Sequence, residues 1–557
     1  MMKPSFRLLP VACAAALLSA CGGDDGPSVD DQLAQDIQNV VVIYAENRSF
    51  DSLYGNFPNA HGLSDVIDTA TGKTTAAYVP QIDRDGKTVL PTLPPTWGGV
   101  TAAGQSVTVT QQQSAGLANA PFNITKTFAG VDGSVNTRDL YHRFFENQMQ
   151  INGGKNDQFA AWGDSGGLVM GYFDYSSSPL YKLAQKYTLA DNFFQGAFGG
   201  SFLNHQYLVC ACAPEFPNAD TSPQKPSITV VDNDASGNPT YKLTVASDAK
   251  ASALDAAAKF QLSGNVTPKN YFGDGKYYAV NTMQPPYQPS GNAPAADASG
   301  DNLKYANPTA ATTLPAQTAS TIGDLLTAKK VDWAWYSGSW NAAVKDGTQV
   351  STAARNVIYK GDANGNASAA TVDFQPHHHP FNFYKRFDTV SGASERSAHL
   401  KDYDDLVKAA AAGSLPAVAF YKPDGYNNQH PGYTNINQAD THISDLVAKL
   451  QASPQWKNLL IVVTYDENGG QWDHVAPPKG DKIGPGSRIP AIIISPWAKK
   501  GVVDHTPYDT ASVLRFITRR WGLDKLPGLK QRDDAIKANG GTALGDLTSA
   551  LDFSLNQ

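Results

Sequence analysis

Acidic and amide side chains stand after two apolar runs that lie far apart in the chain. Glu46 and Asn47 follow the run NVVVIY and one alanine, and Asp466 and Glu467 follow the run NLLIVVTY. Crowded carboxylates repel one another and their pKa values rise, so a divalent cation with hard oxygen ligands would keep them ionised. We therefore consider these four residues candidate metal ligands. The spacing alone fits four solvated loop residues equally well.

A serine with two glycines before it is a candidate nucleophile. Ser201 follows Gly199 and Gly200 and precedes the apolar, helix-like run FLNHQYLVCAC. A serine at a helix N-terminus lies beside backbone N–H groups and the positive end of the helix dipole, which stabilise a phosphate or an ionising hydroxyl. The same position is also that of an ordinary N-cap serine, so the pattern leaves both interpretations open.

The chain has eleven histidines, several of which stand in clusters or polar loops. A single histidine is more often structural than catalytic. His142 lies in a predicted helix over 138–149, while His430 and His474 lie in polar segments. Neighbouring side chains of an extended chain point to opposite sides, so at most two of the three histidines 377–379 can serve one site.

The elements that must position these residues form an α/β pattern. Continuously apolar strands are buried on both faces, as in a parallel sheet, and helical patterns lie between them. Ligands of such sheets bind at the carboxyl ends of the strands, where the acids stand. We predict a central, mostly parallel sheet flanked by helices. Its strands are predicted at 39–44, 331–336, 416–421, 458–465 and 489–495, and helices at 402–412, 439–451 and 507–520.

Two regions interrupt this alternation. Residues 66–125 and 215–310 are rich in Ala, Thr, Pro, Asn and Gly and contain only short strand-like pieces. We interpret them as loop and β insertions that cap the site rather than as independent domains. The predicted domain therefore spans 37–525, with a C-terminal extension at 526–557.

The composition excludes several classes of protein. The chain has 557 residues, of which 41% are apolar and 17% charged. These values are typical of a globular protein and not of a disordered, collagen-like or coiled-coil chain. The net charge is -7, and no long Lys/Arg run could follow a phosphate backbone. We expect no nucleic-acid partner.

The N-terminus indicates export. Basic residues precede an apolar stretch that is too short to span a membrane, as in a secretory signal. The quartet LSAC that ends at Cys21 resembles the lipobox of bacterial lipoproteins, whose cysteine is lipidated. We predict a signal peptide over 1–20, a tether over 21–36 and membrane contact through a lipid on Cys21, which places the protein in the cell envelope at the outer membrane. The alternative is an ordinary signal peptide with an incidental cysteine.

Cys210 and Cys212 are the cysteines of the predicted domain. A bridge across one intervening residue would be strained, because disulfides need a specific geometry. We therefore predict that both are small buried hydrophobic residues, and that stability comes from the core and a bound metal rather than from a disulfide.

Two motifs make the chain similar to a known family. The segments Glu46–Asp51 and Thr464–Gly470, together with Asp473–Val475, resemble the bacterial family of acid phosphatases and phosphocholine-cleaving phospholipases C, within the alkaline phosphatase-like superfamily. The resemblance spans residues 37–520. The segment Ser201–Gln206 looks like the acid phosphatase branch, because phospholipase C members usually carry Thr or Ser followed by His-Pro-Asn-Arg there.

The resemblance implies an alkaline phosphatase-like fold and a set of metal ligands. Glu46, Asn47, Asp466 and Glu467 would hold one divalent metal ion, and Ser201 would complete the set and act as the nucleophile. Related acid phosphatases often carry Asp in place of Glu467, so this ligand departs from their pattern.

The resemblance also implies residues that bind and protonate the substrate. His142, His377 and Asn204 would line the phosphate pocket, and His378 or His430 would protonate the leaving alkoxide. Histidines with an ordinary pKa near 6.5 are charged on the acidic side of neutrality, so we expect an acidic pH optimum.

These implications lead to one expected function and two alternatives. We expect a metal-dependent acid phosphatase that hydrolyses small phosphomonoesters through a phosphoserine intermediate. The first alternative is a phospholipase C that cleaves phosphodiesters such as phosphatidylcholine. The second is a catalytically degenerate surface lipoprotein that binds a ligand. A degenerate site should have lost ligands or its nucleophile, whereas all expected residue types are present here.

Overall fold

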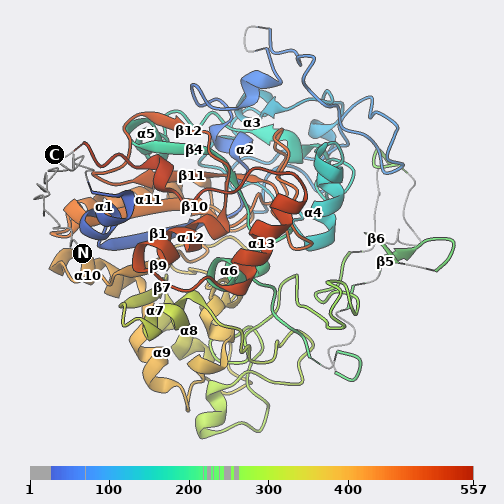
Figure 1. Cartoon of the computed structure of the whole chain (residues 1–557). Coiled ribbons are helices and arrows are strands. Elements are labelled where there is room, and N and C mark those ends of the chain that lie inside the picture. Colours follow the sequence, from blue (N-terminus) through green and yellow to red (C-terminus); the bar gives the residue numbers. More distant parts are fainter. Residues whose placement is uncertain are drawn as a thin grey trace, which may run out of the picture.

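A large mixed sheet with flanking helices forms the centre of the computed structural model (Figure 1). The structure describes residues 27–68, 71–217, 219–222, 228–229, 231–237, 239–243, 252–255 and 262–555. Within these residues, nine strands form the main sheet, in the order β12-β4-β11-β10-β1-β9-β7-β8, and β13 also pairs with β4. These strands are β1 Asn39–Ala45, β4 Thr188–Phe194, β7 Trp333–Ser337, β8 Leu400–Asp402, β9 Val418–Lys422, β10 Leu459–Tyr465, β11 Arg488–Ile494, β12 Val502–Asp504 and β13 Tyr508–Asp509.

The prediction of a mostly parallel sheet is confirmed. β1 pairs in parallel with β10 and β9, and β7 pairs in parallel with β8 and β9. Every residue of β1, β10 and β11 is buried, as their continuous apolar runs predict. β11 differs from the expectation because it runs antiparallel to both β10 and β4.

Two helices of the fold each pack against two others. α5 and α10 both pack against α11, and α6 and α1 both pack against α12. The three predicted helices of the alternation are confirmed as α10, α11 and α12. The helices are α1 Val29–Asp36, α2 Phe50–Tyr54, α3 Ile124–Thr127, α4 Phe144–Ile151, α5 Pro179–Lys186, α6 Ser201–Cys210, α7 Ile322–Ala328, α8 Trp340–Gly347, α9 Ala393–His399, α10 Tyr403–Ala412, α11 Ile436–Gln451, α12 Thr510–Trp521 and α13 Pro527–Ala538.

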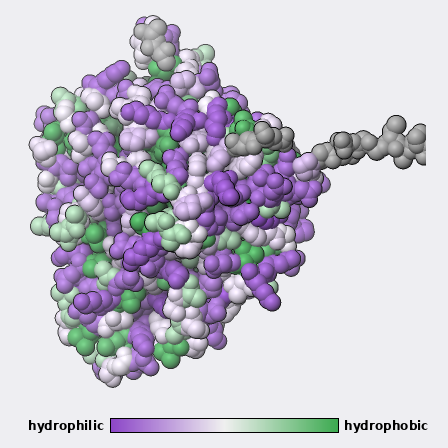
Figure 2. All heavy atoms as spheres, turned by 90° about the vertical axis from the view of Figure 1, so that its left-hand side faces the viewer, coloured by the Kyte–Doolittle hydropathy of each residue, from purple (hydrophilic) through white to green (hydrophobic). Residues whose placement is uncertain are grey.

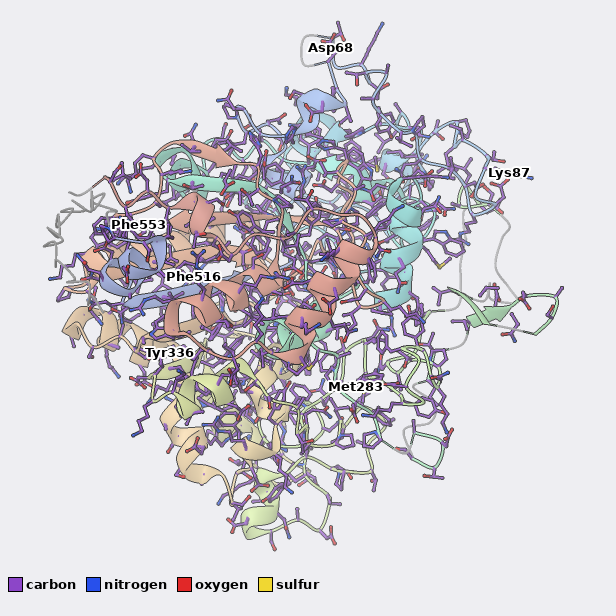
Figure 3. The ribbon with its side chains drawn as sticks, in the orientation of Figure 1. Asp68, Lys87, Met283, Tyr336, Phe516 and Phe553 are labelled. Atoms are coloured by element: carbon purple, nitrogen blue, oxygen red, sulfur yellow. A yellow bond between two sulfur atoms is a disulfide. The ribbon has the colours of Figure 1, made fainter. Side chains whose placement is uncertain are left out.

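Loops predominate in the described parts of the two predicted insertions. Asp68 and Lys87 of the first insertion lie at the periphery of the molecule (Figure 3). The second contains the small β5–β6 hairpin, Val231–Asn233 and Pro239–Leu243, and the remaining short strands are β2 Phe122–Asn123 and β3 Gly171–Tyr172. The second insertion is anchored beside α4, because Ser263 N donates a 2.8 Å hydrogen bond to Glu146.

Described segments on both sides of the predicted domain, 37–525, pack against it. The second half of the expected tether forms α1, which is held on α12 by a 3.0 Å hydrogen bond from Arg520 to the carbonyl of Ala34. In the expected C-terminal extension, the buried guanidinium of Arg532 forms ion pairs with Asp509 at 2.6 Å and Asp481 at 2.9 Å. These contacts make both segments part of the folded domain.

The expected signal peptide and Cys21 lie outside the described residues. In the described part of the chain, no helix has both the length and the apolar character that a membrane crossing requires. Hydrophilic residues predominate on the face in Figure 2, where hydrophobic residues form small separate groups.

Cys210 and Cys212 form a disulfide, so the prediction of two unbridged hydrophobic residues is wrong. Cys210 ends α6, and Ala211 after it adopts a left-handed conformation with a φ of 51°. This turn brings the two cysteine Cα atoms to 5.1 Å, a separation that ordinary disulfides span. The bridge depends on the backbone conformation of the residue between the cysteines, which their spacing does not reveal.

Candidate active site

The two acidic loops meet at one edge of the sheet. β1 and β10 are neighbouring parallel strands, and Ala45 pairs with Tyr465 at their carboxyl ends. The loops that follow are joined by hydrogen bonds from Asp466 N to Ala45 O at 3.0 Å and from Asn47 N to Asp466 Oδ1 at 3.1 Å. The predicted convergence of the two motifs is therefore confirmed.

Ser201 lies among the predicted metal ligands. Its Oγ is 3.1 Å from Glu46 Oε2, 3.5 Å from Asn47 Oδ1 and 3.4 Å from Glu467 Oε1. Ser201 is the first residue of α6, and Gly200 is the N-cap, so the hydroxyl is not used as a helix cap. The alternative interpretation as an ordinary N-cap serine is wrong.

The turn before Ser201 requires glycine. Gly199 has a φ of +84°, and a Cβ at this position would lie 2.4 Å from the backbone nitrogen of Phe144. Glycine adopts this backbone conformation without steric cost and leaves space for the neighbouring chain. The Gly-Gly pair thus allows α6 to begin deep inside the protein, beside the acidic loops.

Asn204 holds this turn instead of facing the site. Its Nδ2 donates to the carbonyls of Gly199 at 3.2 Å and Gly200 at 3.1 Å, and its Oδ1 accepts from Ala197 N at 2.9 Å. The side chain is fully buried, and both ends of its amide are used. The predicted role in substrate binding is therefore corrected to a role in positioning Ser201.

The acidic cluster fits a divalent cation. Glu46, Asp466 and Glu467 are fully buried. Burial and repulsion from Asp466 raise the pKa of Glu46 to about 8, and the same causes raise the pKa of Glu467. Asp466 Oδ2 is buried without a hydrogen-bond partner. Three carboxylates, the amide oxygen of Asn47 and a hydroxyl form an all-oxygen donor set of the kind that hard divalent cations prefer.

Lys422 lies at the acidic cluster, although the sequence patterns did not single it out. It ends β9, the neighbour of β1, and its buried Nζ forms an ion pair with Glu46 and a 3.2 Å hydrogen bond to Tyr44 O. The pair opposes the rise in the pKa of Glu46 that burial causes. A lysine at the polar end of a buried strand was the signal available in the sequence.

Three predicted histidines surround the acids. His378 Nε2 lies 3.3 Å from Glu46 Oε1, and His430 Nε2 lies 4.0 Å from Glu46 Oε2. His142 Nε2 lies 3.6 Å from Glu467 Oε1. His142 precedes α4 and is not helical, which corrects the predicted helix over 138–149.

The three adjacent histidines diverge. Their segment forms a 3-10 turn over Pro376–His378 and is not extended. The rings of His377 and His378 are 4.1 Å apart, and His377 Nδ1 shares a 2.7 Å hydrogen bond with Tyr359 Oη. His379 packs on Trp340 instead. How many of the three serve one site stays a prediction, and its premise of an extended chain is wrong, because the segment forms a 3-10 turn.

The site histidines are less basic than expected. Burial lowers the pKa of His377 to about 3 and also lowers the pKa of His378 and His430. The expectation of charged imidazoles below neutrality used the ordinary value, which applies in water. A phosphate group beside these rings would favour their protonated forms and oppose this shift.

His205 is a second residue that sequence reasoning missed as part of the site. It lies one turn after Ser201 in α6, and its Nδ1 donates a 2.7 Å hydrogen bond to Ser201 O. Its ring stacks on His378 at 4.8 Å, and its Nε2 is buried without a hydrogen-bond partner. The i, i+4 spacing from Ser201 was the signal that could have identified it.

His474, which had no assigned role, belongs to a separate buried network. Its Nδ1 lies 2.7 Å from Asp51 Oδ2. Arg488 forms ion pairs with Asp51 at 3.0 Å and with Asp473 at 2.9 Å. The network joins α2, which follows the Glu46 loop, to the loop that follows β10. It therefore stabilises the positions of both acidic loops.

Comparisons with known proteins identify the family of this chain. The family model described as Phosphoesterase family matches residues 37–524. The chain is 31% identical over 183 residues to a non-hemolytic phospholipase C of Pseudomonas aeruginosa. The matched segment covers 27% of this chain and 25% of that protein. The chain is also 33% identical over 159 residues to non-specific phospholipase C6 of Arabidopsis thaliana. This matched segment covers 22% of this chain and 30% of that protein. The chain thus matches less than a third of the length of these relatives.

One solved structure, titled as a protein in the alkaline phosphatase superfamily from Vibrio parahaemolyticus, was also found. It overlaps 68% of this chain and 65% of its own, at 12% identity and a TM-score of 0.28. The family match, in contrast, covers most of the chain and includes both acidic loops, Ser201 and the surrounding histidines. The chain belongs to the Phosphoesterase family.

Proposed function

We propose that this protein is a metal-dependent phosphoric ester hydrolase that acts on phosphomonoesters with Ser201 as its nucleophile. The observation that carries the proposal is the position of Ser201 Oγ at the N-terminus of α6, 3.1 Å from Glu46 and 3.4 Å from Glu467. Nearby carboxylates disfavour an ionised serine, so the arrangement serves a nucleophile only when a cation balances their charge.

The metal ligands follow from the donor set. Glu46, Asn47, Asp466 and Glu467 would hold one divalent ion, with Ser201 Oγ beside it. When bound, such an ion lowers the pKa of an adjacent hydroxyl and neutralises charge on the phosphoryl group. The ionised carboxylates of the cluster would hold the ion in place, in a buried region that largely excludes water.

The protein's own groups perform the transfer. Ser201 gives its hydroxyl proton to solvent, and its Oγ forms a bond to phosphorus while the bond to the leaving oxygen breaks on the opposite side, which produces a phosphoserine. His378 or His430 gives its proton to the leaving alkoxide. Water then gives a proton to the same histidine and attacks phosphorus, while the bond to Ser201 Oγ breaks, phosphate leaves and Ser201 regains a proton from solvent. His142 and His377 lie where they can bind the phosphoryl oxygens, together with the N–H groups of α6.

Enclosure and charge favour a monoester over a diester. Ser201 is only 4% exposed and the side chain of His142 only 18%. A monoester has one organic branch to place outside such a site, whereas a diester has two. A monoester dianion also interacts more strongly with Lys422 and with the helix N-terminus than a diester monoanion does.

Phospholipase C activity is the second candidate, because the curated relatives carry that name. Purified protein should be assayed with p-nitrophenyl phosphate and p-nitrophenylphosphorylcholine under identical conditions. Faster release of nitrophenol from the monoester is the expected result. A faster reaction with the choline diester would support phospholipase C instead.

Replacement of the nucleophile tests the mechanism directly. Ser201→Ala should lower kcat by on the order of 10³-fold or more, and should abolish the acid-stable phosphate label on the enzyme. Ser397→Ala, which changes an exposed serine, serves as the matched control. If Ser201→Ala keeps more than a few per cent of the wild-type rate, Ser201 is not the nucleophile.

Retention of the nucleophile and four oxygen ligands disfavours the alternative of a catalytically degenerate surface lipoprotein.

We further propose that the chain is exported and anchored in the envelope by a lipid on Cys21. In the producing cell, Cys21→Ala should move the protein from the membrane fraction to the soluble fraction. An unchanged distribution would exclude the anchor.

A further inference from the structure

Two exposed histidines and one buried aspartate form a cluster away from the acidic loops. His61 follows α2, Asp191 lies in β4, and His505 follows β12. One possible ligand atom from each residue lies within 4.8 Å of those of the other two. The cluster contains none of the residues assigned to phosphoester hydrolysis.

The pairing of two strands brings the cluster together. β12 runs parallel to β4, with Asp504 opposite Ala190, so His505 comes to lie beside Asp191 (Figure 1). His505 Nδ1 is 2.9 Å from Asp191 Oδ2, and the rings of His61 and His505 are 4.8 Å apart. The histidines are about half exposed, whereas Asp191 is fully buried.

Hydrogen bonds hold the backbones of all three residues. The buried Arg488 donates to the carbonyl of His61 at 2.6 Å and to that of Asp191 at 2.9 Å. His61 N donates to Asp191 Oδ2 at 2.8 Å, and Asn192 Nδ2 donates to His505 O at 3.1 Å. The backbone is therefore fixed, and only the two imidazoles need to turn to accept a ligand.

A second carboxylate lies at the edge of the cluster. Asp65 Oδ2 is 3.6 Å from His61 Nδ1 and 3.5 Å from His474 Nε2. Two imidazoles with one or two carboxylates suit Zn²⁺ and related transition metals, which bind nitrogen and oxygen ligands in tetrahedral sites. The all-oxygen cluster around Glu46 differs in this respect, because it contains the harder donors.

We propose that His61, Asp191 and His505 form a second metal site, specific for zinc-like ions, on the surface of the protein. Asp65 or water completes its coordination. The ion joins three segments that are distant in sequence, namely the loop after α2, β4 and the segment after β12. By mass action, an ion that binds only the folded protein stabilises it against unfolding.

Zinc binding to the full-length holoenzyme tests the proposal. Wild-type protein and His61→Ala should be dialysed against the same buffered free zinc near neutral pH, and the zinc per chain should be measured by elemental analysis. His61→Ala is the informative variant because it leaves the contact between Asp191 and His505 in place. His399→Gln, which changes a histidine outside the cluster, is the matched control.

Wild-type protein and His399→Gln should bind one more zinc ion per chain than His61→Ala, whose affinity at this site should fall at least about tenfold. Zinc should also raise the thermal midpoint of wild-type protein more than that of His61→Ala. Equal zinc content and equal midpoint shifts in these proteins would overturn the proposal and leave an ordinary ion pair between Asp191 and His505.

Discussion

Arg488→Met is expected to weaken the buried network that stabilises the acidic loops, and so to destabilise the folded protein. The guanidinium is fully buried and forms ion pairs with Asp51 at 3.0 Å and Asp473 at 2.9 Å. It also donates to the carbonyls of His61 and Asp191. Methionine fills a similar volume but leaves these four oxygens without that donor.

The size of the effect follows from burial. Removal of one partner from a buried ion pair costs about 3–5 kcal/mol. We expect a loss within this range, because Asp51 keeps its contact with His474 and Asp473 keeps a 3.0 Å hydrogen bond from Asp51 N. An unfolding entropy of about 2.1 cal/mol/K per residue gives about 1.2 kcal/mol/K for this chain. The thermal midpoint should therefore fall by roughly 3–4 °C.

Calorimetry at neutral pH measures this shift, with Arg519→Met as the control. Arg519 pairs with Asp30 and Asp546 at the surface, where loss of an ion pair costs about 1 kcal/mol or less. The loss for Arg488→Met should shrink as pH falls, because burial already raises the pKa of Asp473 to about 6 in wild-type protein, removal of Arg488 raises it further, and protonation removes the unpaired charge. If the midpoint shifts of the two variants are the same at neutral pH, the network does not support the fold as argued.

Three further predictions concern the site and its helix. Once the metal has been removed by chelation, the free energy of unfolding should fall as pH rises from about 4.5 to about 8. Burial raises the pKa of Glu46 to about 8, so over this range the folded state holds a proton that the unfolded state has lost. A thermal midpoint independent of pH over this range would contradict the charge balance. Asn204→Ala should lower kcat and leave KM nearly unchanged, since the side chain holds the turn before Ser201; a rise in KM alone would restore the substrate-binding role. Reduction of the Cys210–Cys212 disulfide, which closes a very short loop, should lower stability by only about 1–2 kcal/mol, measured by calorimetry with and without reductant; a loss above about 4 kcal/mol would refute the loop-length argument.

Several features of the site were predictable because they leave local patterns in the sequence. The apolar runs before Glu46 and Asp466 predict buried strands, and strands of a parallel sheet carry their polar ends to one edge. The Gly-Gly pair before an apolar run predicts that Ser201 begins a helix. Together with the motif similarity, these patterns predicted the family and the set of oxygen ligands.

Other features required the tertiary structure. Lys422 enters the site because β9 lies next to β1 in the sheet. No local sequence pattern predicts this order of strands. Asn204 faces the turn before Ser201 rather than the site because of the direction in which its side chain points. The lowered pKa of His378 depends on burial, which arises only when distant segments close around the ring.

The sequence by itself thus determined which residues stand at the ends of strands and helices, and therefore the chemistry the site can use. The tertiary structure decided which of those residues face one another, how deeply they are buried and what charge they carry. The physical reason is that periodicity and strand ends are local properties of the chain. Desolvation and contacts such as that between Asp191 and His505 join residues that only folding brings together.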